Sequence, residues 1–250
     1  MAVSIKSARE IERMREAGKR LAHVHQELEA MIAPGISTWE IDAKGEKLIR
    51  DCGCIPNFLH YNGYPASICV SVNDEVVHGI PRKDRYLKEG DIVSLDAGLI
   101  YKGYHSDAAR THAVGKVSTE AQKLMDVTKQ SFFEGIKMAK EGQHLHDVSR
   151  AIEEYVTPYG YGIVRDLVGH GIGTALHEDP QIPNYAQKRR GVRLQAGMTL
   201  AIEPMINAGT WQVRFLRDGW TVVTKDGSLS AHYENTILVT DGEPEILTLY

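Results

Sequence analysis

The stretch VSLDAGLIYKGYHSDAARTH, residues 93–112, decides the fold prediction, because it reads as two strands around a turn and contains two aspartates. Aspartate is depleted in strands, and like charges that face each other across a ladder are destabilising. A turn at residues 101–102 places Asp96 opposite Asp107, whereas a turn at residues 102–103 offsets them by two positions. Side chains alternate along a strand, so both registers put the two carboxylates on one face; a three-residue loop would separate them.

The two carboxylates need a partner if their face of the hairpin is buried. Their neighbours are mostly apolar, so we expect at least one buried face. A buried, unpaired carboxylate is very costly unless it is protonated, paired or bound to a metal. The alternative is a polar hairpin edge with both aspartates in water. On this stretch alone, both interpretations stay open.

The composition is that of an ordinary globular protein. The chain has 250 residues, of which 42% are hydrophobic and 25% charged, enough for a substantial core. The formal net charge of −4 argues against a dedicated nucleic-acid-binding protein. We interpret the one basic run, Lys188-Arg189-Arg190, as a solvated loop.

Cysteine usage and hydropathy indicate where the protein works. Cys52, Cys54 and Cys69 are an odd number in a long chain, which favours free thiols in a reducing compartment. No apolar run approaches the length of a membrane span. The N-terminal stretch is charged within ten residues and has no apolar core, so we expect no signal peptide and a cytoplasmic protein that does not contact membranes.

Helices and strands alternate in two rounds. Capping boxes at Ser7-x-x-Glu10, Ser37-x-x-Glu40 and Thr119-x-x-Gln122 predict helices that end near Pro34-Gly35, near Gly53 and at about Lys140, and a fourth helix runs from about Leu145 to Tyr155. We expect strands at residues 66–72 and 91–114, in MTLAIEPMI, in GWTVVT and in SAHYENTILVT. VVHGIP (residues 76–81) resembles VGHGIG (residues 168–173), which supports a hypothesis of internal pseudo-symmetry.

Further potential metal ligands lie in the second half of the chain. Glu203 lies in an apolar strand just before Pro204, Glu234 enters another strand, and His170 lies between glycines that leave room for a ligand. Taken singly, such a glutamate is usually an edge residue and such a histidine usually structural. Taken together, four carboxylates and one imidazole suit two divalent first-row ions such as manganese, iron or cobalt. Two such ions can share a bridging water and lower its pKa.

The sequence resembles the type I methionine aminopeptidases over essentially its whole length. The matching stretches are VNDEVVHGIP, DIVSLDAGLIYKGYHSDAARTHAVG, VGHGIGTALHEDPQIPNY, GMTLAIEPM and DGSLSAHYENTILVT. The resemblance implies an α+β pita-bread fold, with a central curved antiparallel sheet covered by helices, in a single catalytic domain, residues 1–250. Its pseudo-two-fold halves would be about 1–115 and 116–250.

The resemblance also implies an activity and a set of site residues. The family removes the initiator methionine from nascent polypeptides when the second residue is small, which implies nascent N-termini, at the ribosome, as partners of a monomeric enzyme. The implied cofactor is two divalent ions per chain, with cobalt, manganese, iron, nickel and zinc left open. The implied metal ligands are Asp96, Asp107, His170, Glu203 and Glu234.

Substrate contacts are implied in the same way. His78 and His177 match the two family histidines that contact substrate, and Glu203 is the best candidate to transfer a proton. The implied methionine pocket consists of Phe58, Tyr61, Tyr64, Cys69, His78, Leu176 and Trp220. Phe58 and Leu176 depart from the family pattern, where we expect a smaller residue and an aromatic one. Tyr61 and Tyr64 also have a plainer interpretation as turn tyrosines around Asn62-Gly63.

Two other functions stay open at this point. A prolidase or Xaa-Pro aminopeptidase uses a similar ligand set on the same fold, although those enzymes usually carry an extra N-terminal domain. A catalytically dead relative that acts as a ribosome or RNA adaptor should have lost metal ligands, whereas all five are present here.

Overall fold

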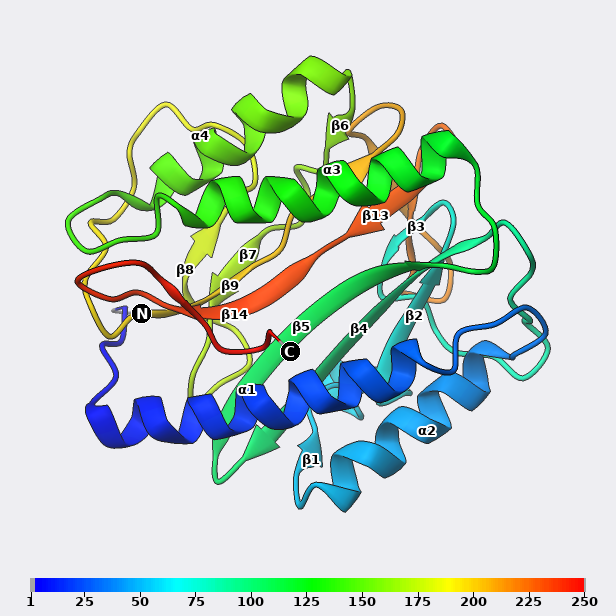
Figure 1. Ribbon diagram of the computed structural model, residues 1–250, viewed down its shortest axis with the longest axis horizontal. Coiled ribbons are helices and arrows are strands. Elements are labelled where there is room, and N and C mark those ends of the chain that lie inside the picture. Colours follow the sequence, from blue (N-terminus) through cyan, green and yellow to red (C-terminus); the bar gives the residue numbers. More distant parts are fainter. Residues whose placement is uncertain (1–2, 250) are drawn as a thin grey trace.

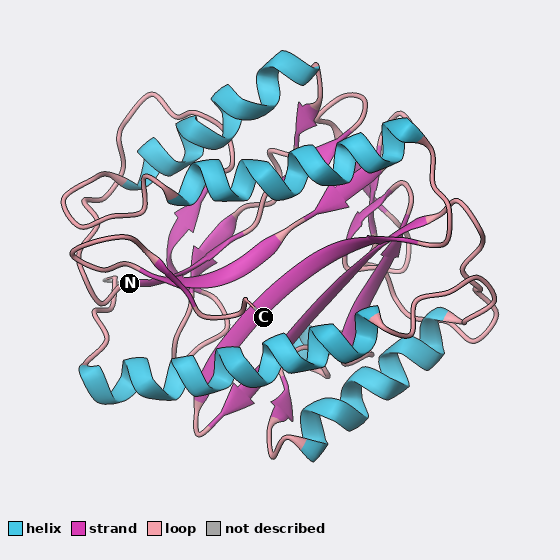
Figure 2. Cartoon of the chain, in the orientation of Figure 1, coloured by secondary structure: helices cyan, strands magenta, loops and turns pink. Residues whose placement is uncertain are grey.

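A central antiparallel sheet with helices on one face organises the computed structural model, which describes residues 3–249 (Figures 1 and 2). The α-helices are α1 (Ala8–Glu29), α2 (Thr38–Asp51), α3 (Thr119–Ile136) and α4 (Leu145–Val156), and short 3₁₀ turns cover Tyr61–Gly63 and Thr157–Tyr159. The strands are β1 (Ile55–Pro56), β2 (Ile68–Val72), β3 (Glu75–Val77), β4 (Ile92–Tyr101), β5 (Tyr104–Ala113), β6 (Gly162–Ile163), β7 (Gly169–Gly171), β8 (Glu178–Ile182), β9 (Thr199–Ile202), β10 (Met205–Asn207), β11 (Val213–Phe215), β12 (Val222–Thr224), β13 (Ser230–His232), β14 (Glu234–Leu238) and β15 (Glu245–Ile246).

The main sheet joins the two ends of the chain. Its nine strands run in the order β1-β4-β5-β14-β9-β7-β8, with β2 also paired to β4 and β15 to β14. Two three-stranded sheets, β13-β10-β6 and β11-β12-β3, complete the strand pairing. Because β14 lies between β5 and β9, the main sheet is continuous across both rounds of elements.

Helices cover one face of this sheet in two pairs, α1 with α2 and α3 with α4 (Figure 1). Under the first pair, Leu95 and Ala97 of β4 pack with Leu21 of α1 in one apolar cluster. Under the second pair, Ile202 and Tyr233 pack with helix residues in another. Alternation along the strands therefore leaves Asp96, Glu203 and Glu234 on the opposite face, away from the helices.

Most of the predicted elements are confirmed, but the cap and end of the third helix and the extent of one strand differ from the prediction. The capping boxes at Ser7 and Ser37 are present. The third helix, however, is capped by Ser118, whose hydroxyl accepts a hydrogen bond from the Ala121 N–H, and it ends at Ile136 instead of Lys140. MTLAIEPMI is not one strand either, because the chain leaves the ladder at Glu203-Pro204 between β9 and β10.

The α+β prediction is confirmed, and so is the expectation of thiols, since Cys52, Cys54 and Cys69 are free. Lys188, Arg189 and Arg190 are exposed, as expected of a solvated loop, and Arg190 pairs with Asp147. Within residues 3–249, no helix combines the length and the apolar character needed to cross a bilayer.

Candidate metal centre and adjoining pocket

The β4–β5 hairpin answers the question of register. Tyr101 pairs with Tyr104, so the turn is Lys102-Gly103, and both turn residues have positive φ, 49° and 81°. This is the turn geometry that suits the twist of a tight hairpin. Asp96 pairs with Ala109 and Asp107 with Gly98, which puts both carboxylates on the face away from the helices.

His170 enters the same face from β7, and its flanking glycines have a structural reason. A Cβ at Gly169 would lie 2.5 Å from the Ala201 oxygen, and one at Gly171 would lie 2.2 Å from the Asp179 oxygen. The glycines therefore let β7 pack tightly between its neighbouring strands. His170 Nδ1 lies 2.9 Å from the Gly171 carbonyl oxygen, which accepts its hydrogen bond and leaves Nε2 free.

Glu203 and Glu234 complete the group from the strands beside β7 and β5. Glu203 Oε1 lies 3.6 Å from His170 Nε2, and the Glu203 carbonyl accepts a hydrogen bond from Asn184 Nδ2 at 3.0 Å. Glu234 is only 2% exposed and pairs with Ala109, the residue opposite Asp96. Strand pairing therefore brings together carboxylates that are more than a hundred residues apart in the chain.

Burial makes this group of carboxylates unfavourable by itself. It raises the pKa of Asp96 to about 7 and of Glu203 to about 8. The pKa values of Asp107 and Glu234 are raised well above the ordinary range, first by burial and then by the neighbouring carboxylates. Nearby Arg110 donates hydrogen bonds to the carbonyl oxygens of Ala109 and Thr248 and to Asn235 Oδ1, and its charge opposes the rise in the pKa of Glu234.

The donor atoms fit a divalent cation. One ligand atom each from Asp107, His170 and Glu234 lies within 4.8 Å of the other two. Buried oxygens of Asp96, Asp107 and Glu234 lack a hydrogen-bond partner, which is the state expected of oxygens arranged for a metal. Carboxylates with an imidazole are the donors that such ions prefer.

All thirteen predicted site residues line one cavity of about 210 Å³ together with Asn62. The lining includes the five proposed ligands. It also includes His78, His177 and the aromatic, aliphatic and sulfur-bearing residues of the predicted methionine pocket, which are Phe58, Tyr61, Tyr64, Cys69, Leu176 and Trp220. Tyr61 and Tyr64 are thus both turn residues and part of the cavity wall.

His78 is held in an uncommon conformation beside this cavity. Its φ is 59°, a region that non-glycine residues rarely occupy. The next residue, Gly79, donates its N–H to Ser71 Oγ at 3.1 Å and accepts a hydrogen bond from the Tyr64 hydroxyl at 2.9 Å. The His78 ring meets the edge of Trp220 at 6.2 Å, and burial lowers its pKa to about 4, so the imidazole is neutral.

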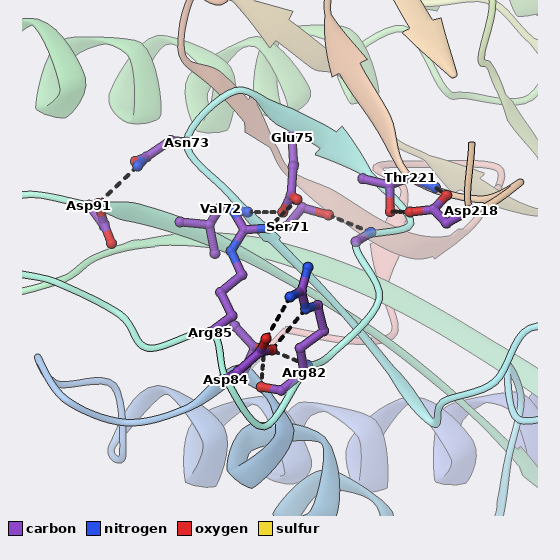
Figure 3. Close-up of polar contacts among 12 residues, drawn as sticks. Ser71, Val72, Asn73, Glu75, Arg82, Asp84, Arg85, Asp91, Asp218 and Thr221 are labelled. Carbon is purple, nitrogen blue, oxygen red and sulfur yellow. Dashed lines mark hydrogen bonds and ion pairs between the residues drawn. The ribbon is translucent and has the colours of Figure 1, made fainter. Parts of the chain in front are cut away.

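Polar contacts around the β2–β3 turn and the Trp220 loop hold these segments (Figure 3). Glu75 accepts a hydrogen bond from the Val72 N–H at 2.8 Å and forms an ion pair with Arg85. In the Trp220 loop, Asp218 accepts hydrogen bonds from the backbone N–H groups of Trp220 and Thr221, both at 2.8 Å. The segments that carry His78 and Trp220 into the cavity lining are therefore held by their own hydrogen bonds.

His232 is a site residue that the sequence analysis missed. Its Nε2 lies 3.7 Å from Glu203 Oε2, the residue is 2% exposed, and neither ring nitrogen has a hydrogen-bond partner. Burial lowers its pKa to about 4. The signal was available, since His232 lies two positions before Glu234 and strand alternation puts both on one face.

Comparison with known proteins now identifies the family. The profile of Metallopeptidase family M24 matches residues 12–241. The chain belongs to metallopeptidase family M24. The methionine aminopeptidase of Clostridium acetobutylicum is 53% identical over 99% of both chains, and methionine aminopeptidase 1 of Bacillus subtilis is 51% identical over 97% of this chain and 98% of its own.

Solved structures of M24 enzymes confirm the pita-bread fold. The crystal structure of methionine aminopeptidase from Thermotoga maritima matches with a TM-score of 0.97 and 47% identity over 100% of both chains. A prolidase from Pyrococcus furiosus, at 23% identity and a TM-score of 0.76, covers 98% of this chain and 65% of its own, and shares the fold alone. Within the M24 family the chain groups with the methionine aminopeptidases, so the predicted family and enzyme class are confirmed.

Proposed function

We propose that the protein removes the initiator methionine from nascent polypeptides whose second residue is small, in the cytoplasm and at the ribosome, with two divalent ions held by Asp96, Asp107, His170, Glu203 and Glu234. The observation that carries the proposal is that buried carboxylates and apolar, aromatic and sulfur-bearing side chains line the same cavity. Contacts between thioethers and aromatic rings favour methionine by about 0.3–1.5 kcal/mol each.

Divalent ions bound here would supply an activated water and polarise the scissile carbonyl. The residues of the chain do the rest. Asp96 receives the free amino group of the substrate. His78 and His177 donate hydrogen bonds to the carbonyl oxygen as it gains negative charge. Glu203 accepts a proton and delivers it to the departing amine, the usual role of a positioned carboxylate.

The first side chain of the substrate would enter between Phe58, Cys69 and Leu176. Phe58 and Leu176 are 8% and 2% exposed, so both belong to the cavity wall and do not block its mouth. Compared with the family pattern, position 58 has a larger side chain and position 176 a smaller one. This exchange changes the shape of the space but keeps it apolar. We therefore expect methionine to stay preferred, with norleucine tolerated comparatively well.

Peptide hydrolysis tests the function directly. We expect the manganese-loaded protein to cleave Met-Ala-Ser far faster than Ala-Pro peptides, and a chelator to stop the reaction. A preference for proline at the second position, with indifference at the first, would instead identify an Xaa-Pro peptidase. Comparing Met-Ala-Ser with Met-Leu-Ser tests the requirement for a small second residue.

A further inference from the structure

Tyr61 lies in a turn with an unusual backbone. The non-glycine residues His60 and Asn62 have φ values of 67° and 49°, and Gly63 has a φ of 89°. Left-handed conformations are uncommon for non-glycine residues, although asparagine adopts them more readily than most. Such strain clusters at functional sites. Here the turn is held by a hydrogen bond of 2.8 Å from the His60 N–H to the Tyr64 carbonyl, and it places Tyr61 in the cavity wall.

The Tyr61 hydroxyl contacts a residue from the other half of the chain. It lies 2.7 Å from His177 Nδ1, and the two rings are 5.4 Å apart. On its other side, the His177 ring meets the His170 ring edge-on at 4.3 Å. The His177 imidazole is therefore fixed by a hydrogen bond to one nitrogen and by a packed ring.

The direction of this hydrogen bond follows from chemistry. A phenol is a stronger acid than the N–H group of a neutral imidazole, so the Tyr61 hydroxyl is the better donor and Nδ1 of His177 the acceptor. In a neutral imidazole only one nitrogen carries a proton. With Nδ1 accepting, the proton is on Nε2, and that nitrogen becomes the donor that the ring can offer to a substrate.

We propose that Tyr61 is a positioning residue for His177: its hydroxyl selects the imidazole tautomer with the proton on Nε2 and aims that N–H at the carbonyl oxygen of the scissile peptide. The proposal rests on the proposed function, in which His177 donates to this oxygen. It gives Tyr61 a role beyond lining the pocket, and it explains why a strained turn carries this side chain.

A double-mutant cycle separates a positioning role from a pocket-wall role. Tyr61→Phe should lower kcat for Met-Ala-Ser about tenfold to a hundredfold and leave KM within about twofold of the wild type. This loss of kcat is smaller than the roughly 10²–10³-fold loss on removing an oxyanion donor itself. In a His177→Ala background, Tyr61→Phe should cause no further loss. A rise in KM with unchanged kcat, or losses that multiply in the double variant, would overturn the proposal.

Tyr104→Phe is the matched kinetic control, because the Tyr104 hydroxyl donates to Glu10 at 3.0 Å and Tyr104 is not among the residues that line the cavity. It should keep the turnover of the wild type. Manganese affinity, measured by calorimetry, should be the same in Tyr61→Phe and the wild type. Weaker metal binding in Tyr61→Phe would mean that the substitution acts through the metal centre and not through His177.

The tautomer can be observed without any activity. Nitrogen-15 NMR of the zinc-loaded protein should find the His177 proton on Nε2 in the wild type and a mixture of tautomers in Tyr61→Phe. Tyr64→Phe should keep the wild-type tautomer, because the Tyr64 hydroxyl donates to the Gly79 carbonyl and not to His177. A wild-type proton on Nδ1 would overturn the proposal. If the Nε2 tautomer depends on Tyr61 but Met-Ala-Ser is not cleaved, the positioning contact stands and the proposed function fails.

Discussion

Asp107 belongs to the group of three potential metal ligands, and exchanging one of its carboxylate oxygens for an amide nitrogen tests its role. Its ligand atom lies within 4.8 Å of those of His170 and Glu234, and the residue is 4% exposed. Asp107→Asn keeps the size but removes the charge, so we expect metal content and activity to fall together, measured by metal analysis after gel filtration. Asp84→Asn, a surface carboxylate paired with Arg82, is the control and should bind metal normally. Unchanged metal content in Asp107→Asn would exclude a ligand role.

His170 and His177 are seven residues apart, yet their surroundings predict different roles. His170 Nε2 faces Glu203 and Asp107 at 3.6 and 4.0 Å, whereas His177 Nδ1 bonds Tyr61. We expect His170→Ala to weaken metal binding, with activity partly restored by added metal. His177→Ala should keep its metal and lose mainly turnover, by roughly 10²–10³. Calorimetric metal titration beside kinetics on Met-Ala-Ser checks both; equal loss of metal would contradict this division.

At the scale of elements, short sequence patterns predicted the helices but did not determine how the strands pair. Ser7 and Ser37 mark helix starts because their hydroxyls and the following glutamates satisfy free N–H groups at short range. Ser118 and Thr119 offer competing hydroxyls, and only the folded backbone selects Ser118. The hairpin register depended on whether the positive φ angles fall on Tyr101-Lys102 or on Lys102-Gly103, and the folded chain has them at Lys102 and Gly103.

The grouping of the candidate metal ligands could be predicted for a related reason. Each ligand lies in a stretch with strong local character, and the family resemblance supplied which stretches meet. Alternation with Glu234 placed His232 on the same face, but its approach to Glu203 follows only from the pairing of β13 with β10. Contacts of this kind depend on strand order, which sequence periodicity does not encode.

Helix α1 depends on a close approach to the C-terminal segment. A Cβ at Gly18 would lie 2.2 Å from the backbone oxygen of Leu247. Gly18→Ala should therefore lower the free energy of unfolding by roughly 1–3 kcal/mol, because overpacking outweighs the gain in helix propensity. Denaturant titration measures the change. Gly242→Ala is the control, since its nearest atom would be 3.9 Å away; an equal effect of both substitutions would contradict the packing argument.

At the scale of the whole molecule, the main sheet argues for one cooperative unit. Strands β4 and β5 belong to the first half of the chain, and β5 pairs with β14 from the second. Fragments 1–115 and 116–250 should each fail to fold alone, because each would expose the unpaired β5 or β14 edge and part of the core. Circular dichroism and NMR of the separate and mixed fragments test this. A folded single fragment would instead indicate two domains.

Metal binding should stabilise the whole fold, because it relieves carboxylates that the sheet forces together. A ligand at a hundred times its Kd contributes about 2.7 kcal/mol to the native state. For a chain of this size that corresponds to a rise in Tm of roughly 5–10 °C. We expect manganese to raise the Tm of the chelator-treated wild type by that amount and to leave Asp107→Asn nearly unchanged, measured by scanning calorimetry. The Asp107→Asn protein without metal should be at least as stable as the wild type without metal, since it lacks a buried carboxyl group whose ionisation burial and the neighbouring carboxylates oppose. An equal manganese shift in both proteins would show that the stabilising ion binds somewhere other than this centre.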